Sequence, residues 1–309
     1  MKKLILITFL LFTIISFSQK LNWIPFNWEG AEISGKYFDK LAMTIPITVD
    51  KLPHKFNMQL DLGAINTVFY GSSIKAYLDK YDDFRNKIDT TLTFRMQSKT
   101  NFKLKNVNLK LGQVSFGKIN IGIFKNFGDE IPKDSIMTKT EKHIGTIAPD
   151  LFQGKILIID YAKKRICVVK ALPKEFLKAT FLPYKTKEGR IKIPLNIDGQ
   201  NEDLLFDTGS SLFSLITNKE RADKITEGKI IDSLKISSWG EYYMVYGKKA
   251  KAKVKFGSKT LKQSTIYYDN QKNNENFYKD EAIWGVTGNA YFLNNIVIID
   301  YKNKLFGVK

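Results

Sequence analysis

One three-block pattern occurs twice in this chain, and each copy has an aspartate-glycine turn at its centre. The first copy has Ile45-Pro46, then Leu60-Asp61-Leu62-Gly63-Ala64, then Ile144-Gly145 and Ile158-Ile159-Asp160-Tyr161. The second has Ile193-Pro194, then Phe206-Asp207-Thr208-Gly209-Ser210, then Trp284-Gly285 and Ile298-Ile299-Asp300-Tyr301. Residues 144–169 match residues 284–309 at nine of twenty-six positions without a gap, which indicates a duplicated half. Two related halves that meet about a pseudo-two-fold axis would bring Asp61 and Asp207 together, and two carboxylates that share one proton form an acid–base pair.

Residues 1–18 have the pattern of an export signal. Lys2 and Lys3 precede an apolar run from Leu4 to Phe17, and Ser16-Phe17-Ser18 places small residues before a cleavage site at Gln19. A membrane anchor is the alternative, but a span needs about 20 apolar residues and this run is shorter. We therefore expect an exported protein that is periplasmic or secreted.

The single cysteine and the net charge further limit the classes of protein to which this chain can belong. Cys167 cannot form an internal disulfide, and its place in an apolar segment predicts a small buried residue. The net charge of +18 is compatible with nucleic acid, an anionic envelope surface or acidic substrates as partners. The lysines are spread through every segment, and no nucleic-acid motif accompanies them. We therefore expect a solvated basic surface and no nucleic-acid partner, with attraction to anionic envelope surfaces as the remaining possibility.

Most of the chain is typical of short β-strands separated by turn residues. Strands are expected at 42–49, 55–60, 92–96, 102–111, 119–124, 191–197, 204–206, 242–246, 250–256 and 261–268. The spacing of Ile74, Tyr77, Leu78, Tyr81 and Phe84 predicts a helix, and a weaker helical pattern covers 218–233. The polar run 270–276 is expected to be an exposed loop. Within the expected boundaries, the signal peptide covers 1–18, the N-terminal lobe 19–180 and the C-terminal lobe 181–309.

The two turns carry the residue types that a catalytic carboxylate needs. An apolar strand fixes each aspartate, and Gly63 and Gly209 allow a tight turn with close backbone approach. Thr208 offers a hydroxyl for the opposite turn, and Ser210 offers one for a carboxylate oxygen of Asp207. Asp160 and Asp300 each end an apolar strand and are interpreted as structural turn residues.

The segment Phe206 to Ser211 resembles the active-site signature of pepsin-like and retropepsin-like aspartic peptidases. Asp61-Leu62-Gly63-Ala64 is similar to a degenerate partner, and Gly145 and Gly285 stand where that superfamily has an apolar-apolar-glycine element. The resemblance covers about residues 40–309. It implies a mainly β, bilobal pepsin-like fold with two related β-barrel lobes about a pseudo-two-fold axis and a cleft between them.

The resemblance also implies the activity, an exported aspartic endopeptidase. Asp61 and Asp207 would be catalytic, and Gly63, Ala64, Thr208, Gly209, Ser210, Gly145 and Gly285 would support the site or bind substrate. In that family the cleft binds an extended peptide, and a water activated between the two aspartates attacks the scissile carbonyl. A peptide or protein substrate, a monomeric state, no nucleic-acid partner and no cofactor or metal are expected.

Two positions depart from the family pattern. Leu62 replaces the threonine that would complete a reciprocal tie between the turns, and each missing hydrogen bond is worth about 1 kcal/mol. On this basis, restoring threonine at position 62 is expected to stiffen the turns and raise activity or stability. The hairpin expected to cover the cleft, residues 93–104, has Phe94 and Phe102 but lacks the family's tyrosine.

Several other interpretations stay open at the level of sequence. Asp61 and Asp207 could be ordinary turn residues that lie apart, or they could lie together without doing chemistry. The second case would make the chain a catalytically weak or inactive protein that binds extended peptides or envelope polymers. A third possibility is a surface protein for anionic polymers, whose binding would be sensitive to salt.

Overall fold

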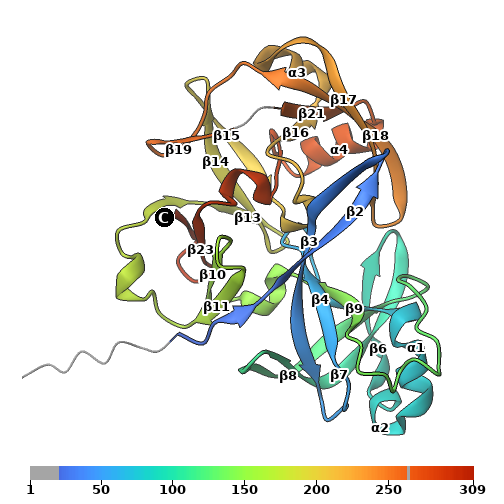
Figure 1. Cartoon of the computed structure of the whole chain (residues 1–309). Coiled ribbons are helices and arrows are strands. Elements are labelled where there is room, and N and C mark those ends of the chain that lie inside the picture. Colours follow the sequence, from blue (N-terminus) through green and yellow to red (C-terminus); the bar gives the residue numbers. More distant parts are fainter. Residues whose placement is uncertain (1–20, 263–264) are drawn as a thin grey trace, which may run out of the picture.

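The protein is mainly β, and its described residues form three sheets and four short α-helices (Figure 1). This computed structural model describes residues 21–262 and 265–309, so the expected export signal lies outside the described residues. We use "first half" for residues 21–180 and "second half" for residues 181–309. One sheet belongs to each half, and strands of both halves build the third.

The sheet of the first half has eight strands in the order β2-β3-β4-β9-β5-β8-β7-β6. An additional pairing of β3 with β7 curls this sheet into a half-barrel. Its strands are β2 (Asn27–Ile33), β3 (Lys36–Val49), β4 (Phe56–Leu60), β5 (Val68–Tyr70), β6 (Ile88–Met96), β7 (Lys99–Leu111), β8 (Val114–Phe124) and β9 (Lys142–Ile147).

The sheet of the second half follows the order β17-β18-β21-β16-β22-β15-β14-β19-β20, with β13 paired to β14. Its strands are β13 (Lys185–Lys187), β14 (Arg190–Ile197), β15 (Gln200–Phe206), β16 (Ile216–Asn218), β17 (Thr226–Ser238), β18 (Glu241–Ala250), β19 (Val254–Phe256), β20 (Lys259–Leu261), β21 (Thr265–Asp269) and β22 (Gly285–Thr287).

The third sheet joins the halves through equivalent strands, in the order β1-β11-β10-β23-β24-β12. Its strands are β1 (Ile24–Pro25), β10 (Ile156–Asp160), β11 (Arg165–Val169), β12 (Thr180–Pro183), β23 (Ile296–Asp300) and β24 (Leu305–Val308). The two central strands run antiparallel, with Ile158 opposite Ile298. These residues are equivalent in the sequence repeat, so the repeat is also symmetric in this sheet.

The helices are short and follow the same plan in both halves. They are α1 (Gly71–Lys80), α2 (Asp82–Arg85), α3 (Lys219–Ile225) and α4 (Lys272–Asp280), with 3₁₀ turns η1 (Pro149–Phe152), η2 (Lys174–Phe176), η3 (Thr208–Ser210) and η4 (Asn289–Phe292). Helix α1 follows β5 and helix α3 follows β16. The helix predicted from Ile74 to Phe84 is present as α1 and α2. None of the helices described is long and apolar enough to cross a lipid bilayer.

Three sequence-based predictions of secondary structure are wrong in part. The predicted helix over 218–233 ends at Ile225, where the Thr226 hydroxyl donates to the Ala222 carbonyl, and the rest belongs to β17. The predicted loop over 270–276 contains the start of α4, a surface helix that buries only Tyr278. The predicted strand over 250–256 is interrupted where Lys251 and Ala252 donate backbone hydrogen bonds to Ile225.

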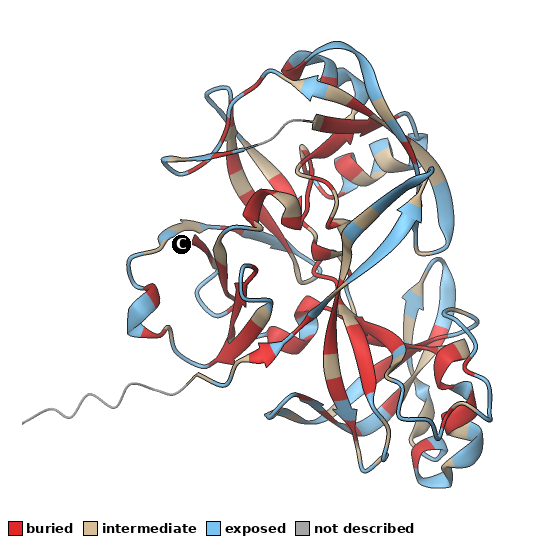
Figure 2. Cartoon of the chain, in the orientation of Figure 1, coloured by how far each residue is buried: buried red, intermediate tan, exposed pale blue. Residues whose placement is uncertain are grey.

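A large apolar core spans both halves, and its members concentrate where the three sheets converge (Figure 2). Cys167 is completely buried in a smaller cluster on the shared sheet, as its sequence context predicted. Asp160 and Asp300 accept backbone hydrogen bonds from Lys163 and from Lys302, respectively, in the turns that follow their strands. Their interpretation as structural turn residues is confirmed.

Candidate active site

The first aspartate turn is fixed by three strands of the first half. Strand β4 leads into Asp61 and pairs in parallel with β9, which lies between β4 and the short strand β5 that follows the turn. The Asp61 amide donates to the Ile147 carbonyl at 2.9 Å, which prolongs the ladder by one bond. The Asp61 Oδ1 atom then accepts from the amides of Gly63 and Ala64 at 2.9 and 3.0 Å.

The second turn repeats this construction in the second half. Strand β15 leads into Asp207 and pairs in parallel with β22, which also pairs with β16. The Asp207 amide donates to the Thr287 carbonyl at 2.9 Å, and its Oδ1 accepts from the Gly209 amide at 2.7 Å. The two aspartates therefore occupy equivalent places, each at the end of a buried central strand.

The two turns face each other at contact distance. A Cβ atom placed on Gly63 would lie 2.4 Å from the Asp207 Cγ, and one placed on Gly209 would lie 2.8 Å from the Asp61 Cγ. Each glycine thus leaves room for the carboxylate of the opposite turn, which is a steric reason for glycine at both positions. The structure brings Asp61 and Asp207 together, and they share a side-chain hydrogen bond.

The electrostatics of the pair follow from this proximity. Burial raises the pKa of Asp61 well above its usual value, and the charge of Asp207 and the hydrogen bond to it raise it further. Burial also raises the pKa of Asp207, against the hydrogen bond from Asp61 and those from the Gly209, Ser210 and Gly63 amides. Because two buried carboxyls in contact resist double ionisation, the pair holds one proton in common, and its titration belongs to the pair.

Thr208 ties the second turn to the first, as its position in the motif predicted. Its Oγ1 atom accepts from the Leu62 amide at 2.9 Å and donates to the Leu60 carbonyl at 2.7 Å. At the corresponding place in the first turn, the Leu62 side chain is completely buried in the main apolar core. Only the second turn therefore supplies a hydroxyl to the contact between the turns. At the equivalent position of the first turn, apolar packing of Leu62 replaces the missing hydrogen bonds.

The remaining predicted site residues shape the backbone of the site. Ala64 is buried and contributes its amide to Asp61, whereas Ser210 approaches Asp207 through its own amide. A Cβ atom on Gly145 would lie 2.2 Å from the Val68 carbonyl oxygen, and one on Gly285 would lie 2.7 Å from that of Ile216. These two glycines allow the strand beneath each turn to cross close to its neighbour.

Several polar residues support the turns and were not predicted from the sequence as site residues. Asn289 donates to the Thr208 carbonyl at 3.0 Å and to the Ser211 hydroxyl at 2.6 Å, and it accepts from the Tyr161 hydroxyl at 2.5 Å. In the first half, Asp150 accepts at 2.6 Å from the Thr67 hydroxyl. A signal for one of them was present, because Tyr161 belongs to the repeated Asp-Tyr pair.

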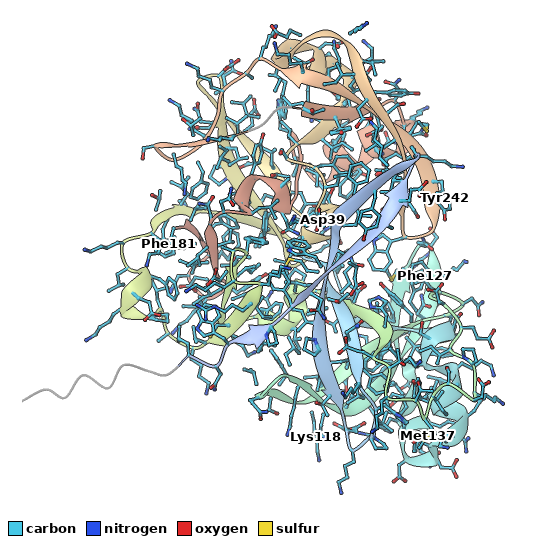
Figure 3. All side chains as sticks on the ribbon, in the orientation of Figure 1. Asp39, Lys118, Phe127, Met137, Phe181 and Tyr242 are labelled. Atoms are coloured by element: carbon cyan, nitrogen blue, oxygen red, sulfur yellow. The ribbon has the colours of Figure 1, made fainter. Side chains whose placement is uncertain are left out.

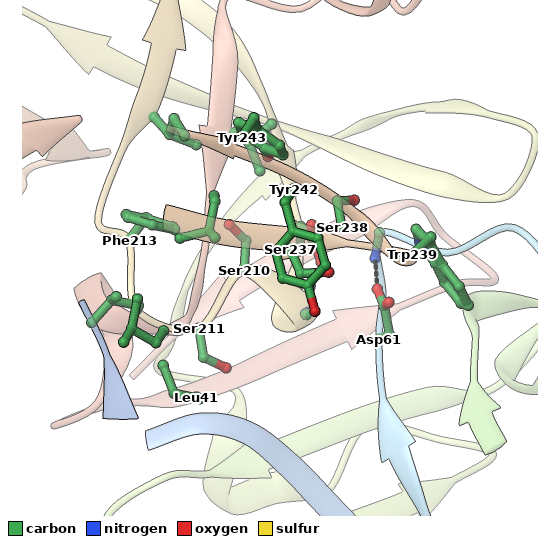
Figure 4. A pocket seen from close by; sticks show the side chains of 18 of the residues that line it. Leu41, Asp61, Ser210, Ser211, Phe213, Ser237, Ser238, Trp239, Tyr242 and Tyr243 are labelled. Atoms are coloured by element: carbon green, nitrogen blue, oxygen red, sulfur yellow. Dashed lines mark hydrogen bonds between the residues drawn. The ribbon is translucent and has the colours of Figure 1, made fainter. Parts of the chain in front are cut away.

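The dyad opens into a cavity of about 970 Å³ whose walls come from both halves. The first half contributes Gln59, Tyr70 and Phe127 beside its turn, and residues 31–34 and Leu41 of the β2–β3 hairpin. The second half contributes a larger set of apolar and hydroxyl side chains. Figure 4 shows that set above Asp61 and includes Ser210, Phe213, Ser237, Ser238, Tyr242 and Tyr243. The Tyr70 hydroxyl is bonded to Thr146 at 2.5 Å, and burial raises the pKa of Tyr70 to about 12, so it stays a neutral wall of the cavity.

The hairpin expected to cover the cleft does not line this cavity. Residues 93–104 form the end of β6 and the start of β7, but the cavity is lined by none of them among the residues described. The hairpin of β17 and β18 covers it from the second half, and with it come Tyr242 and Tyr243. The family resemblance predicted a covering hairpin at residues 93–104 of the first half. The sequence repeat does not indicate which of the two hairpins extends over the dyad.

Comparison of the sequence with models of known families and with curated proteins finds no match. The geometry of the dyad and its cavity is therefore the basis for inferring the function.

Proposed function

We propose that the protein is an exported aspartic endopeptidase of the pepsin-like superfamily, with Asp61 and Asp207 as its catalytic pair. The observation that carries this proposal is the mutual approach of the turns, in which each glycine makes room for the opposite carboxylate. Ordinary turn aspartates have no reason to converge from two halves of a chain at buried strand ends. Bringing two buried acids into contact costs stability, and such sites are typical of function.

The proposed mechanism uses one ionised and one protonated carboxyl. The ionised carboxylate takes a proton from a water bound between the pair, and the water oxygen forms a bond to the scissile carbonyl carbon. The protonated carboxyl donates its proton to the developing oxyanion, which gives a neutral tetrahedral diol. Collapse of the diol breaks the C–N bond as the first carboxyl passes the water proton to the leaving nitrogen. At the same time the second carboxylate takes a proton from a diol hydroxyl, which forms the carboxylic acid product and regenerates the singly protonated pair.

The surroundings of the dyad suit this use. The amides of Gly63, Ala64, Gly209 and Ser210 orient the carboxylates from below, so their outer oxygens are available to the cavity. The cavity volume would hold a few residues of an extended chain, and its wall offers Phe213, Ile216 and Val286 to apolar side chains. In this proposal the two halves are lobes, and the cavity is part of the cleft between them.

The second candidate is a protein that binds extended peptides or envelope polymers without cleaving them. The one-directional tie favours it, because Leu62 contributes no hydroxyl to the turn contact. Buried leucine packing can replace the stability of the missing hydrogen bonds, so the tie alone does not decide between the two functions.

A peptide with a hydroxyethylene group in place of the scissile bond separates these functions. The enzyme proposal expects wild-type protein to bind it at least tenfold more tightly than the matched amide peptide, because the hydroxyl replaces the attacking water. This preference should vanish in both Asp61→Asn and Asp207→Asn proteins. Equal affinity for the two peptides in the wild-type protein would support the binding function instead.

A further inference from the structure

The hairpin of β17 and β18 spans the dyad cavity from the second half towards the first. Its turn is formed by Trp239 and Gly240, with positive φ values of 51° and 89°, as expected for a tight two-residue hairpin turn. Residues 235–239 at the end of β17, with Tyr242 and Tyr243 of β18, line the cavity. Figure 4 shows Ser237, Ser238 and Tyr242 on the same side of the cavity, above Asp61.

Trp239 docks this hairpin onto the first half. Its ring centroid lies 5.7 Å from that of Phe127 and 6.0 Å from that of Phe124, and Phe127 in turn packs edge-on against Tyr70. The Gln97 side chain, at the turn of the β6–β7 hairpin, donates to the Trp239 carbonyl at 2.6 Å. Figure 3 places Phe127 and Tyr242 on the side of the molecule where the two hairpins face each other.

A second tether holds the hairpin further from its tip. The Lys235 amide donates to the Ser34 hydroxyl at 3.0 Å, and Lys36 forms an ion pair with Asp232. Both partners belong to the β2–β3 hairpin, which crosses from the first half to the second (Figure 1). The middle of the covering hairpin is thus held by these polar contacts and by Leu234 and Val245, which are buried in the apolar cluster of the second half, whereas its tip depends on the aromatic contact and one hydrogen bond.

We propose that Trp239 is a positioning residue that holds the β17–β18 hairpin over the dyad, so that Ser237, Ser238 and Tyr243 contact a bound peptide. The proposal rests on the proposed function, because it assigns the cover of that same site. The β2–β3 hairpin also lines the cavity, through residues 31–34 and Leu41, whereas the lining described includes no β6–β7 residue. The docking of the Trp239 ring on Phe124 and Phe127 holds the hairpin over a bound chain and slows the release of that chain.

The test compares Trp239→Ala, Trp239→Phe and Gln97→Ala with the wild-type protein. The control is Tyr37→Ala, which removes an aromatic ring that is 72% exposed on the neighbouring β2–β3 hairpin. Amide hydrogen exchange of residues 232–246 reports docking without any reaction, and the dissociation rate of the hydroxyethylene peptide reports retention. KM and kcat for a fluorogenic peptide complete the comparison.

Trp239→Ala should raise amide exchange in 232–246 and speed peptide release about tenfold, with a similar rise in KM and little change in kcat or in the unfolding midpoint. Gln97→Ala should shift the same quantities in the same direction by less, whereas Trp239→Phe and Tyr37→Ala should resemble wild type. Unchanged exchange and release in both Trp239→Ala and Gln97→Ala would overturn the proposal. If no variant or wild-type protein binds the hydroxyethylene peptide, the proposed function fails, and the docking of Trp239 is still judged by the exchange data.

Discussion

Replacing Thr208 by valine tests the contact between the two turns most sharply. Valine keeps the shape of the side chain but removes the hydroxyl that bonds to both the Leu62 amide and the Leu60 carbonyl. Thr208, Leu60 and Leu62 are all completely buried, so water cannot replace the lost partner. An unsatisfied buried polar group costs about 1–3 kcal/mol, so two of them should lower the free energy of unfolding by about 2–6 kcal/mol.

Urea denaturation followed by circular dichroism measures this change. The matched control is Thr287→Val, because the buried Thr287 hydroxyl makes one hydrogen bond, to the Ser214 carbonyl at 2.8 Å, away from the contact between turns. The control should cost about half as much, and Thr208→Ser should recover most of the loss. A Thr208→Val protein within about 0.5 kcal/mol of wild type would refute the claim that this hydroxyl joins the turns.

Three further predictions follow from the same geometry. Leu62→Thr should lower the free energy of unfolding, because removing a fully buried leucine side chain from the core costs about 2–3 kcal/mol and a new hydrogen bond returns about 1 kcal/mol. This result would be the opposite of the stability gain expected from the sequence. A rise in the urea midpoint would contradict the prediction. Asp61→Asn should stabilise the protein at neutral pH, and should stabilise it less at acid pH. The pKa of Asp61 is raised in the folded state, so the folded state binds more protons than the unfolded state. The wild-type protein therefore loses stability as the pH rises above the usual carboxyl pKa. The idea fails if the stability difference between the two proteins does not change with pH. Gly63→Ala should abolish cleavage and hydroxyethylene-peptide preference while leaving the secondary structure unchanged by circular dichroism, since its Cβ would overlap the Asp207 carboxylate at 2.4 Å; retained activity would mean that the turns lie further apart.

The repeat allowed much of the architecture to be predicted. Asp61 and Asp207 converge because each ends a strand that pairs in parallel with the strand of the downstream glycine, and that relation was visible as motifs repeated in the same order. The role of Thr208 was also accessible, because a hydroxyl beside the aspartate has few partners except the opposite turn.

The rest depended on contacts that local sequence does not encode. Residues 270–276 are rich in asparagine, yet they contain the start of α4 because Tyr278 anchors that helix to the apolar cluster of the second half. The long strand β17 absorbed much of a predicted helix because it pairs with β18. The covering hairpin was sought in the first half, whereas Trp239 finds its aromatic partners only in the folded chain.

The most direct test of the account is peptide-bond cleavage by the wild-type protein and the Asp61→Asn and Asp207→Asn variants from about pH 3 to about pH 7. A singly protonated pair predicts a bell-shaped profile for the wild type, with the acid limb set by loss of the ionised carboxylate and the basic limb by loss of the shared proton. Both variants should lose cleavage at every pH while keeping the wild-type fold by circular dichroism. Cleavage at the wild-type rate by either variant would contradict the assignment of Asp61 and Asp207 as one catalytic pair.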